Sequence, residues 1–196
     1  MLDWSSGYFY SGQVRAHPDN SSITLSQLIR TNDNIMFTAP LLWLDTVDED
    51  WGEDVEDEES ISNIGEAVVV ADIVNRVVTA GLKQEQVGVI TPYWAQVSLI
   101  RSLLWETDGL GRVEVRTVDG FQGREKEMII LSMVRSNDKR EVGFLSESRR
   151  INVSVSRARR CCVIIGDSGT LTHDHCCLSL YNYCRDNQVV HSVRNI

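Results

Sequence analysis

Two short segments of the chain carry residue types that bind phosphates and sugars. The first runs from Thr117 to Glu125 (T-V-D-G-F-Q-G-R-E) and sets two glycines among a hydroxyl and two carboxylates. Glycine lets the backbone turn tightly and approach a ligand closely. Thr117 and Asp119 offer short polar groups to a phosphate or a hydroxyl, and Glu125 offers an acceptor for a ribose hydroxyl. Taken alone, the loop fits a plain turn with solvated charges equally well, because short motifs also occur by chance.

The second segment is rich in arginine and runs from Arg149 to Arg160 (R-R-I-N-V-S-V-S-R-A-R-R). We predict a helix over Glu147–Arg160, which would place Arg150 and Arg157 on one face. A parallel apolar stripe would hold this helix against the core, and it comprises Ile151, Val155 and Ala158. Rigidly held guanidinium groups suit the recognition of a nucleotide phosphate. The alternative is a basic surface helix that only keeps the domain soluble.

These segments need a scaffold, and the hydrophobic pattern predicts alternating strands and helices. The expected strands are Pro40–Thr46, Val87–Thr91, Val113–Thr117, Met128–Val134 and Cys161–Gly166, with an edge strand over Val189–Val193. The expected helices are Ile64–Ala80, Pro92–Leu104 and Leu178–Arg185. Asn63 and Glu66 have the spacing of a helix-capping pair. The alternation predicts an α/β fold with a mostly parallel sheet covered by helices on both faces, and ligand-binding loops at the carboxyl ends of its strands.

The predicted domain organisation is a lead-in over residues 1–39 and one α/β domain over 40–196, because 196 residues suffice for a single core. The net charge of −9 comes from one stretch. Residues 45–59 hold ten acidic side chains and no basic one, so the rest of the chain carries a net charge of +1. We expect a solvated acidic loop over residues 47–60 and a basic face elsewhere.

Cysteine spacing and hydropathy bear on the compartment. The five cysteines include two adjacent pairs but no C-x-x-C spacing, which indicates neither a disulfide framework nor a zinc ribbon. No metal site is expected, and a reducing compartment, cytoplasm or nucleus, is favoured. No apolar run is long enough to span a membrane, so no membrane partner is expected. Trp94 and Trp105 are expected to be packing residues.

Two long strings resemble the last two motifs of the Upf-like superfamily-one helicases. Motif five is matched by T-V-D-G-F-Q-G-R-E-K-E-M-I-I-L-S-M-V-R-S-N, from Thr117 to Asn137. Motif six is matched by G-F-L-S-E-S-R-R-I-N-V-S-V-S-R-A-R-R, from Gly143 to Arg160. T-P-Y-W-A-Q, from Thr91 to Gln96, is similar to the motif that precedes them, and the order of all three agrees. The resemblance covers most of residues 40–167 and implies a RecA-like fold.

The family implies two RecA-like domains that enclose ATP and magnesium and together form a track for single-stranded DNA or RNA. This chain would be the second domain, and the N-terminal RecA-like domain would be its partner. Carried over by position, the resemblance implies that Arg157 is the arginine finger on the γ-phosphate. The residues implied beside the nucleotide are Gly123, Glu125 and Arg150. The residues implied to face the strand are Thr91, Tyr93, Thr117 and Asp119.

The chain also departs from a complete motor. It contains no G-x-x-x-x-G-K-[ST] phosphate-binding loop, and the Asp57–Glu59 triplet lies in the acidic run rather than after an apolar strand. Ser156 stands where the family usually has threonine. We therefore expect the C-terminal half of an ATP-dependent helicase that translocates on and unwinds nucleic acid, with no activity in isolation. The alternative is a non-catalytic RecA-like interaction module from a truncated or degenerate helicase.

Overall fold

A computed structural model describes residues 2–15, 17, 23–29, 37, 39–57, 60–107 and 109–196 of the chain. Within these residues the centre is a six-stranded parallel sheet with the order β5-β4-β6-β7-β1-β8. The strands are β1 (Leu41–Asp45), β4 (Val87–Thr91), β5 (Glu114–Thr117), β6 (Lys126–Ser132), β7 (Ala158–Gly166) and β8 (Val190–Ser192). The predicted α/β class with a mostly parallel sheet is confirmed.

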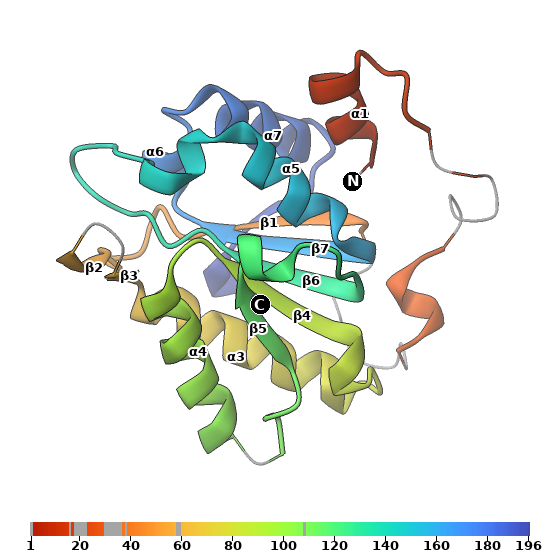
Figure 1. Cartoon of the computed structure of the whole chain (residues 1–196), viewed down its shortest axis with the longest axis vertical. Coiled ribbons are helices and arrows are strands. Elements are labelled where there is room, and N and C mark those ends of the chain that lie inside the picture. The colour runs from red at the N-terminus through yellow and green to blue at the C-terminus, as the bar shows by residue number, and fades with distance from the viewer. Residues whose placement is uncertain are drawn as a thin grey trace.

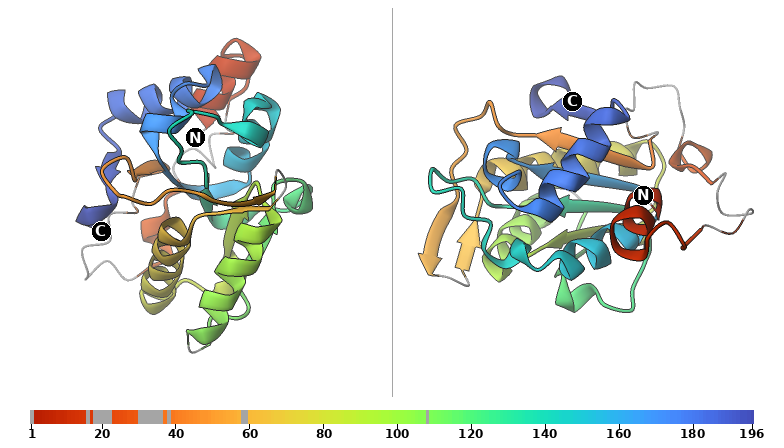
Figure 2. Two further views of the ribbon diagram at one scale, coloured as in Figure 1. Left: turned by 90° about the vertical axis from the view of Figure 1, so that its left-hand side faces the viewer. Right: turned by 90° about the horizontal axis from the view of Figure 1, so that it is seen from above.

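Helices cover both faces of the sheet, as the alternation predicted (Figures 1 and 2). One face carries α3 (Ile64–Thr79) and α4 (Trp94–Glu106). The other face carries α1 (Leu2–Tyr10), α5 (Ser148–Ser156), α6 (Ser168–Leu171) and α7 (His175–Asp186). Alternate strand residues point to opposite faces. Val163 and Ile165 therefore pack in the core beneath α3 and α4, whereas Cys162 and Ile164 pack in the core beneath α5 and α7.

The start of α3 shows how local sequence and tertiary packing combine. The Asn63 side chain accepts a hydrogen bond from the Glu66 backbone amide at 3.0 Å, as a helix cap should. Glu66 does not return the bond to Asn63, because its carboxylate is buried in the core. The Asn63 backbone amide instead donates a hydrogen bond to Gln96 Oε1 at 2.9 Å, which joins α3 to α4.

The acidic segment is partly ordered, which corrects the expectation of a solvated loop. Asp54–Asp57 (β2) and Ser60–Ser62 (β3) pair as antiparallel strands, and residues 58 and 59 lie outside the described part of the chain. The hairpin is anchored by Ile61, which is 3% exposed and packs in one cluster with Tyr93 and Val134. Burial of the Ile61 side chain thus stabilises the hairpin against the domain.

The arginine segment is split between two elements, which corrects the helix predicted over 147–160. Helix α5 ends at Ser156, Arg157 is its C-cap, and β7 begins at Ala158. The Lys126 amide donates to the Arg157 carbonyl at 3.0 Å, and Lys126 pairs with Ala158 across β6 and β7. Pairing of β7 with β6 therefore ends the helix at an earlier residue than the helical pattern of its sequence predicts. Ala158 consequently belongs to the sheet rather than to the helix.

The N-terminal segment packs on the main core, although residues 18–22 and 30–36 of the predicted lead-in lie outside the described part. Trp4 on α1 is buried, and its indole donates to Ser179 on α7 at 3.3 Å. The division of the chain at residue 39 stays a prediction. The five cysteines are free and buried, and burial raises the pKa of the Cys161 and Cys184 thiols to about 12. Among the described helices, none has the length and apolar character needed to cross a bilayer.

Candidate functional site

A groove of about 1080 Å³ opens at the carboxyl ends of β4, β5 and β6. Parallel α/β sheets bind ligands at this edge. Four segments line the groove: the start of α4, the loop after β5, the chain from Arg135 to Phe144 after β6, and the acidic segment with its hairpin, which contributes Glu53, Val55 and Ile61. Its lining includes Pro92, Tyr93, Trp94, Thr117, Asp119 and Phe144. Three of the residues that we predicted to face a nucleic-acid strand therefore come together here, namely Tyr93, Thr117 and Asp119.

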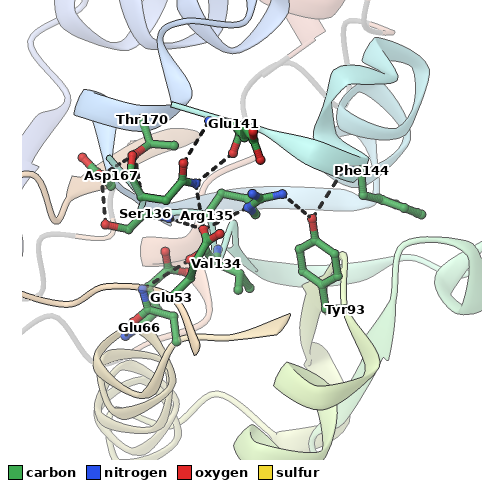
Figure 3. A network of polar contacts seen from close by, with 12 residues as sticks. Glu53, Glu66, Tyr93, Val134, Arg135, Ser136, Glu141, Phe144, Asp167 and Thr170 are labelled. Carbon is green, nitrogen blue, oxygen red and sulfur yellow. Dashed lines mark hydrogen bonds and ion pairs between the residues drawn. The ribbon is translucent and has the colours of Figure 1, made fainter. Parts of the chain in front are cut away.

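Tyr93 and Arg135 form the buried floor of the groove (Figure 3). The Tyr93 hydroxyl accepts hydrogen bonds from Arg135 Nη1 at 3.2 Å and from the Phe144 amide at 3.4 Å. Arg135 Nε also pairs with Glu53 Oε2 at 2.9 Å, and both side chains are less than 8% exposed. A guanidinium held in this way positions the groove wall and has little freedom to bind a ligand.

Glu53 clamps the loop that follows β6. Besides Arg135, its Oε2 atom accepts from the Ser136 amide at 2.8 Å and from Asn137 Nδ2 at 3.0 Å. On the other side of the loop, Asp167 Oδ2 accepts from Ser136 Oγ at 3.0 Å. Figure 3 shows these contacts converging from separate elements. The loop is therefore fixed from both sides, which sets the shape of the groove.

Glu66 lies beneath this loop and is fully buried. Its Oε2 atom accepts from Ser132 Oγ at 2.6 Å and from the Val134 amide at 2.9 Å, whereas Oε1 has no hydrogen-bond partner among the described residues. Val134 has a φ of 73°, a left-handed conformation that costs energy in a β-branched residue. Burial raises the pKa of Glu66 to about 8. A titratable carboxyl thus holds the strained residue from which the groove loop begins.

The glutamine and threonine of T-P-Y-W-A-Q are buried rather than exposed to the groove. Gln96 donates from Nε2 to the Asn63 carbonyl and to Ser132 Oγ, each at 3.0 Å, and so joins α4 to α3 and β6. Thr91 is fully buried, its hydroxyl has no hydrogen-bond partner among the described residues, and it does not line the groove. Direct contact between Thr91 and a bound strand would require this edge of the sheet to open.

The loop after β5 begins with the short helical turn η3 (Asp119–Phe121). Thr117 Oγ1 accepts from the Gly120 amide at 3.3 Å, as in an ordinary turn, while Thr117 and Asp119 also line the groove. Gly123 has a φ of 74°, which favours glycine for conformational reasons. A plain turn therefore explains why glycine occurs at position 123. It does not explain why the Asp119 side chain lines the groove.

Arg157 lies against the loop that carries Gly123 and Glu125. Its Nε atom donates to the Val153 carbonyl at 3.1 Å, and its Nη1 atom donates to the Arg124 carbonyl at 3.4 Å. No carboxylate in the described part of the chain forms an ion pair with it. The helix end and the loop carbonyl thus hold the Arg157 guanidinium in place by hydrogen bonds to two backbone oxygens, and the Glu125 carboxylate is near enough to interact with its charge.

The other residues predicted beside the nucleotide have partners. Arg150 lies with its guanidinium carbon 3.5 Å from the Phe144 ring centroid and its Nη2 atom 3.9 Å from Asp119, so it contacts the groove lining. Glu125 pairs with Arg159, and this hydrogen bond lowers the pKa of the Glu125 carboxyl. Glu125 is therefore a charged acceptor that already has a partner.

Sequence reasoning missed several residues of the site. Trp94 is 60% exposed and lines the groove, and Trp105 is 80% exposed, so the expectation that both are packing residues is wrong. Glu53 was counted as one of ten acidic residues in a solvated loop and was not predicted to belong to the site. The signals that were available are the position of Trp94 directly after the strand-terminal T-P-Y, and the R-S-N string that follows β6.

Comparison with known proteins decides the family. A family model described as an AAA domain matches residues 1–169. The chain is 42% identical over 181 residues to DNA-binding protein SMUBP-2 of Mesocricetus auratus, which covers 92% of the chain and 18% of that protein. It belongs to this family, within the Upf-like superfamily-one helicases.

Two further relatives support the same assignment. DNA polymerase alpha-associated DNA helicase A of Saccharomyces cerevisiae is 43% identical over 175 residues, which is 85% of the chain and 26% of the helicase. The regulator of nonsense transcripts 1 homolog of Drosophila melanogaster is 38% identical over 136 residues, which is 67% of the chain and 12% of that protein. The resemblance to the C-terminal RecA-like domain is therefore confirmed, and the chain is a helicase-family domain. It spans only 18% to 26% of the length of SMUBP-2 and the yeast helicase.

Proposed function

We propose that this chain is the C-terminal half of an ATP-dependent helicase motor, which translocates on and unwinds nucleic acid when joined to an N-terminal RecA-like domain. The observation that carries the proposal is the placement of Arg157. Its guanidinium has no carboxylate partner in the described structure and rests on the Gly123–Glu125 loop. A fixed cation of this kind suits an arginine finger, which stabilises the charge that develops on a transferred phosphoryl group.

On the nucleotide side, Gly123 would lie beside the nucleotide and Glu125 would exchange Arg159 for a ribose hydroxyl. Arg150 would belong to the same site and, through its contact with Asp119, join it to the groove. The described residues contain no group of three or more His, Cys, Asp or Glu that could hold a metal ion. We assign magnesium and most phosphate contacts to the N-terminal domain, because this chain contains no G-x-x-x-x-G-K-[ST] phosphate-binding loop.

On the strand side, Tyr93, Thr117 and Asp119 would form half of the track for single-stranded DNA or RNA, with Thr91 supporting them from below. The charges of the groove favour bases over phosphates. Glu53 and Arg135 in its lining pair with each other, which leaves three carboxylates (Asp119, Asp138 and Glu141) against Lys139. The expected basic face is also reduced by pairing, because Arg160 binds Glu127 at 2.6 Å. We therefore expect weak binding with a shallow salt dependence, since few cations are available to replace counterions.

A domain exchange tests the proposal. The matching segment of the Saccharomyces cerevisiae helicase is replaced by this chain, and ATP turnover and strand unwinding are measured. We expect the chimera to hydrolyse ATP and Arg157→Ala to reduce turnover by roughly a thousandfold, the scale of an arginine finger. Arg149→Ala is the matched control, because Arg149 is exposed on the same helix.

Three outcomes are informative. Loss of turnover with Arg157→Ala alone supports the finger. A chimera in which Arg157→Ala folds and hydrolyses ATP within a few-fold of the unmodified chimera shows that the finger assignment is wrong. A folded chimera that binds nucleic acid without hydrolysing ATP favours the non-catalytic module instead.

A further inference from the structure

We propose that Trp94 is a stacking platform for an unpaired base of the strand in the groove. This inference rests on the proposed function and assigns a base-binding position to the strand side of the same site. Trp94 is the first residue of α4 and follows Tyr93, which forms the groove floor. It is 60% exposed and lines the groove together with Thr117 and Asp119. A large indole left open at a ligand-sized groove is a surface suited to a flat partner.

The indole is also braced from one side. The guanidinium carbon of Arg101 lies 5.3 Å from the centroid of the Trp94 ring. Arg101 is itself anchored, because its Nη2 atom donates to the Val115 carbonyl on β5 at 2.7 Å. A ring that is already held loses less conformational freedom when a ligand stacks on it. Arg101 is thus a positioning residue for the platform.

The charge of the groove identifies the occupant as a base. Phosphate is disfavoured, because the lining carboxylates outnumber the available cations. A nucleobase is uncharged and planar, its face can stack on an indole, and its amino groups can donate to carboxylates such as Asp119. The partly exposed Phe144 ring adds apolar surface to the groove, next to the buried Tyr93 ring, whose centroid lies 6.2 Å away.

The experiment uses the 196-residue chain and fluorescence anisotropy with two labelled oligonucleotides. One is a short thymidine oligomer, and the other is an abasic strand of the same length. We expect Trp94→Ala to weaken binding to the thymidine strand by roughly 5- to 150-fold, which is the scale of one base–aromatic stack. Trp94→Phe should retain part of the affinity, because phenylalanine keeps an aromatic face.

Two controls isolate the stack. Trp105→Ala removes a more exposed indole from the same helix, outside the groove lining, and should leave the affinity unchanged. On the abasic strand, Trp94→Ala and the wild type should bind equally, because there is no base to stack. Thermal melts of each variant check that the fold is intact.

The results separate this inference from the proposed function. If the wild type binds the thymidine strand and neither Trp94 variant weakens it, the platform is wrong while the strand track stands. The platform is also wrong if Trp94→Ala weakens the abasic strand as strongly, since Trp94 would then support the groove without touching a base. If the wild type binds no strand at all, both the platform and the strand half of the proposed function are wrong.

Discussion

Replacing Glu66 with glutamine should remove a large part of the pH dependence of stability. Glu66 is fully buried, and its neighbours on Oε2 are a hydroxyl and a backbone amide rather than a cation. Because burial disfavours the charged form, the pKa of this carboxyl rises to about 8 in the folded protein. In the unfolded chain the pKa of this carboxyl is near the ordinary glutamate value of 4.5.

The sign and size of the effect follow from these two values. Between about pH 4.5 and pH 8 the folded state keeps a proton on Glu66 that the unfolded state has released. The free energy of unfolding therefore falls as pH rises through this window, by about 1.4 kcal/mol per pH unit from this one group. Its stabilising contribution is complete below the window and is lost by its upper end. From pH 6 to 7.5 the expected loss is roughly 2 kcal/mol.

Urea denaturation at pH 6, 6.75 and 7.5 measures this dependence. Glu66→Gln should be less stable than the wild type at pH 6 by about 1 to 3 kcal/mol, because the glutamine NH₂ group places two N–H donors where the protonated carboxyl places one O–H, and no acceptor lies at the Oε1 position among the described residues. Its stability should fall much less with pH than that of the wild type. Glu106→Gln, at an exposed carboxylate on α4, is the control and should keep the wild-type slope. Equal slopes for the wild type and Glu66→Gln would refute the reasoning.

Three further results are expected. The isolated chain should show no ATP turnover above background in a steady-state phosphate-release assay, because it lacks a phosphate-binding loop, and clear turnover by contaminant-free protein would contradict this. Glu53→Ala should reduce the free energy of unfolding by about 3 to 5 kcal/mol in urea denaturation, since it leaves buried Arg135 unpaired, and adding Arg135→Met should recover part of the loss. In the chimera, Arg157→Lys should restore little of the turnover lost in Arg157→Ala, because an ammonium group cannot reproduce the planar fork; full rescue would contradict a finger role.

Local patterns predicted the scaffold closely, and pairing between distant strands set its limits. The helix expected over Ile64–Ala80 is observed over Ile64–Thr79, because its cap, Asn63, and its stop, Gly81, directly flank the segment in the sequence. Strand β7 begins at Ala158, three residues before the predicted start. The prediction began too late because Arg159 and Arg160 precede the apolar run and do not fit its hydrophobic pattern. Both arginines pair with Glu127 on β6, and such a cross-strand partner is invisible in the sequence of β7 itself.

The acidic segment shows the same limit within the site. Charge counting treated all ten of its carboxylates alike and predicted solvation. Glu53 differs because Arg135, 82 residues later, lies beside it in the folded chain. Burial of one acidic residue through a distant partner depends on the tertiary fold, so composition could not single it out.

The motif T-P-Y-W-A-Q shows why a motif match and a site assignment are separate steps. The match treats the named positions as the informative ones, yet Tyr93 and Gln96 are buried and hold neighbouring elements together. Trp94, which lies between these two buried residues in the string, is the residue that the fold exposes to the groove. Tyr93 and Gln96 therefore hold the scaffold together, and we expect contact with a base at Trp94. Only burial and position in the groove make that distinction, because both kinds of residue belong to the same six-residue string.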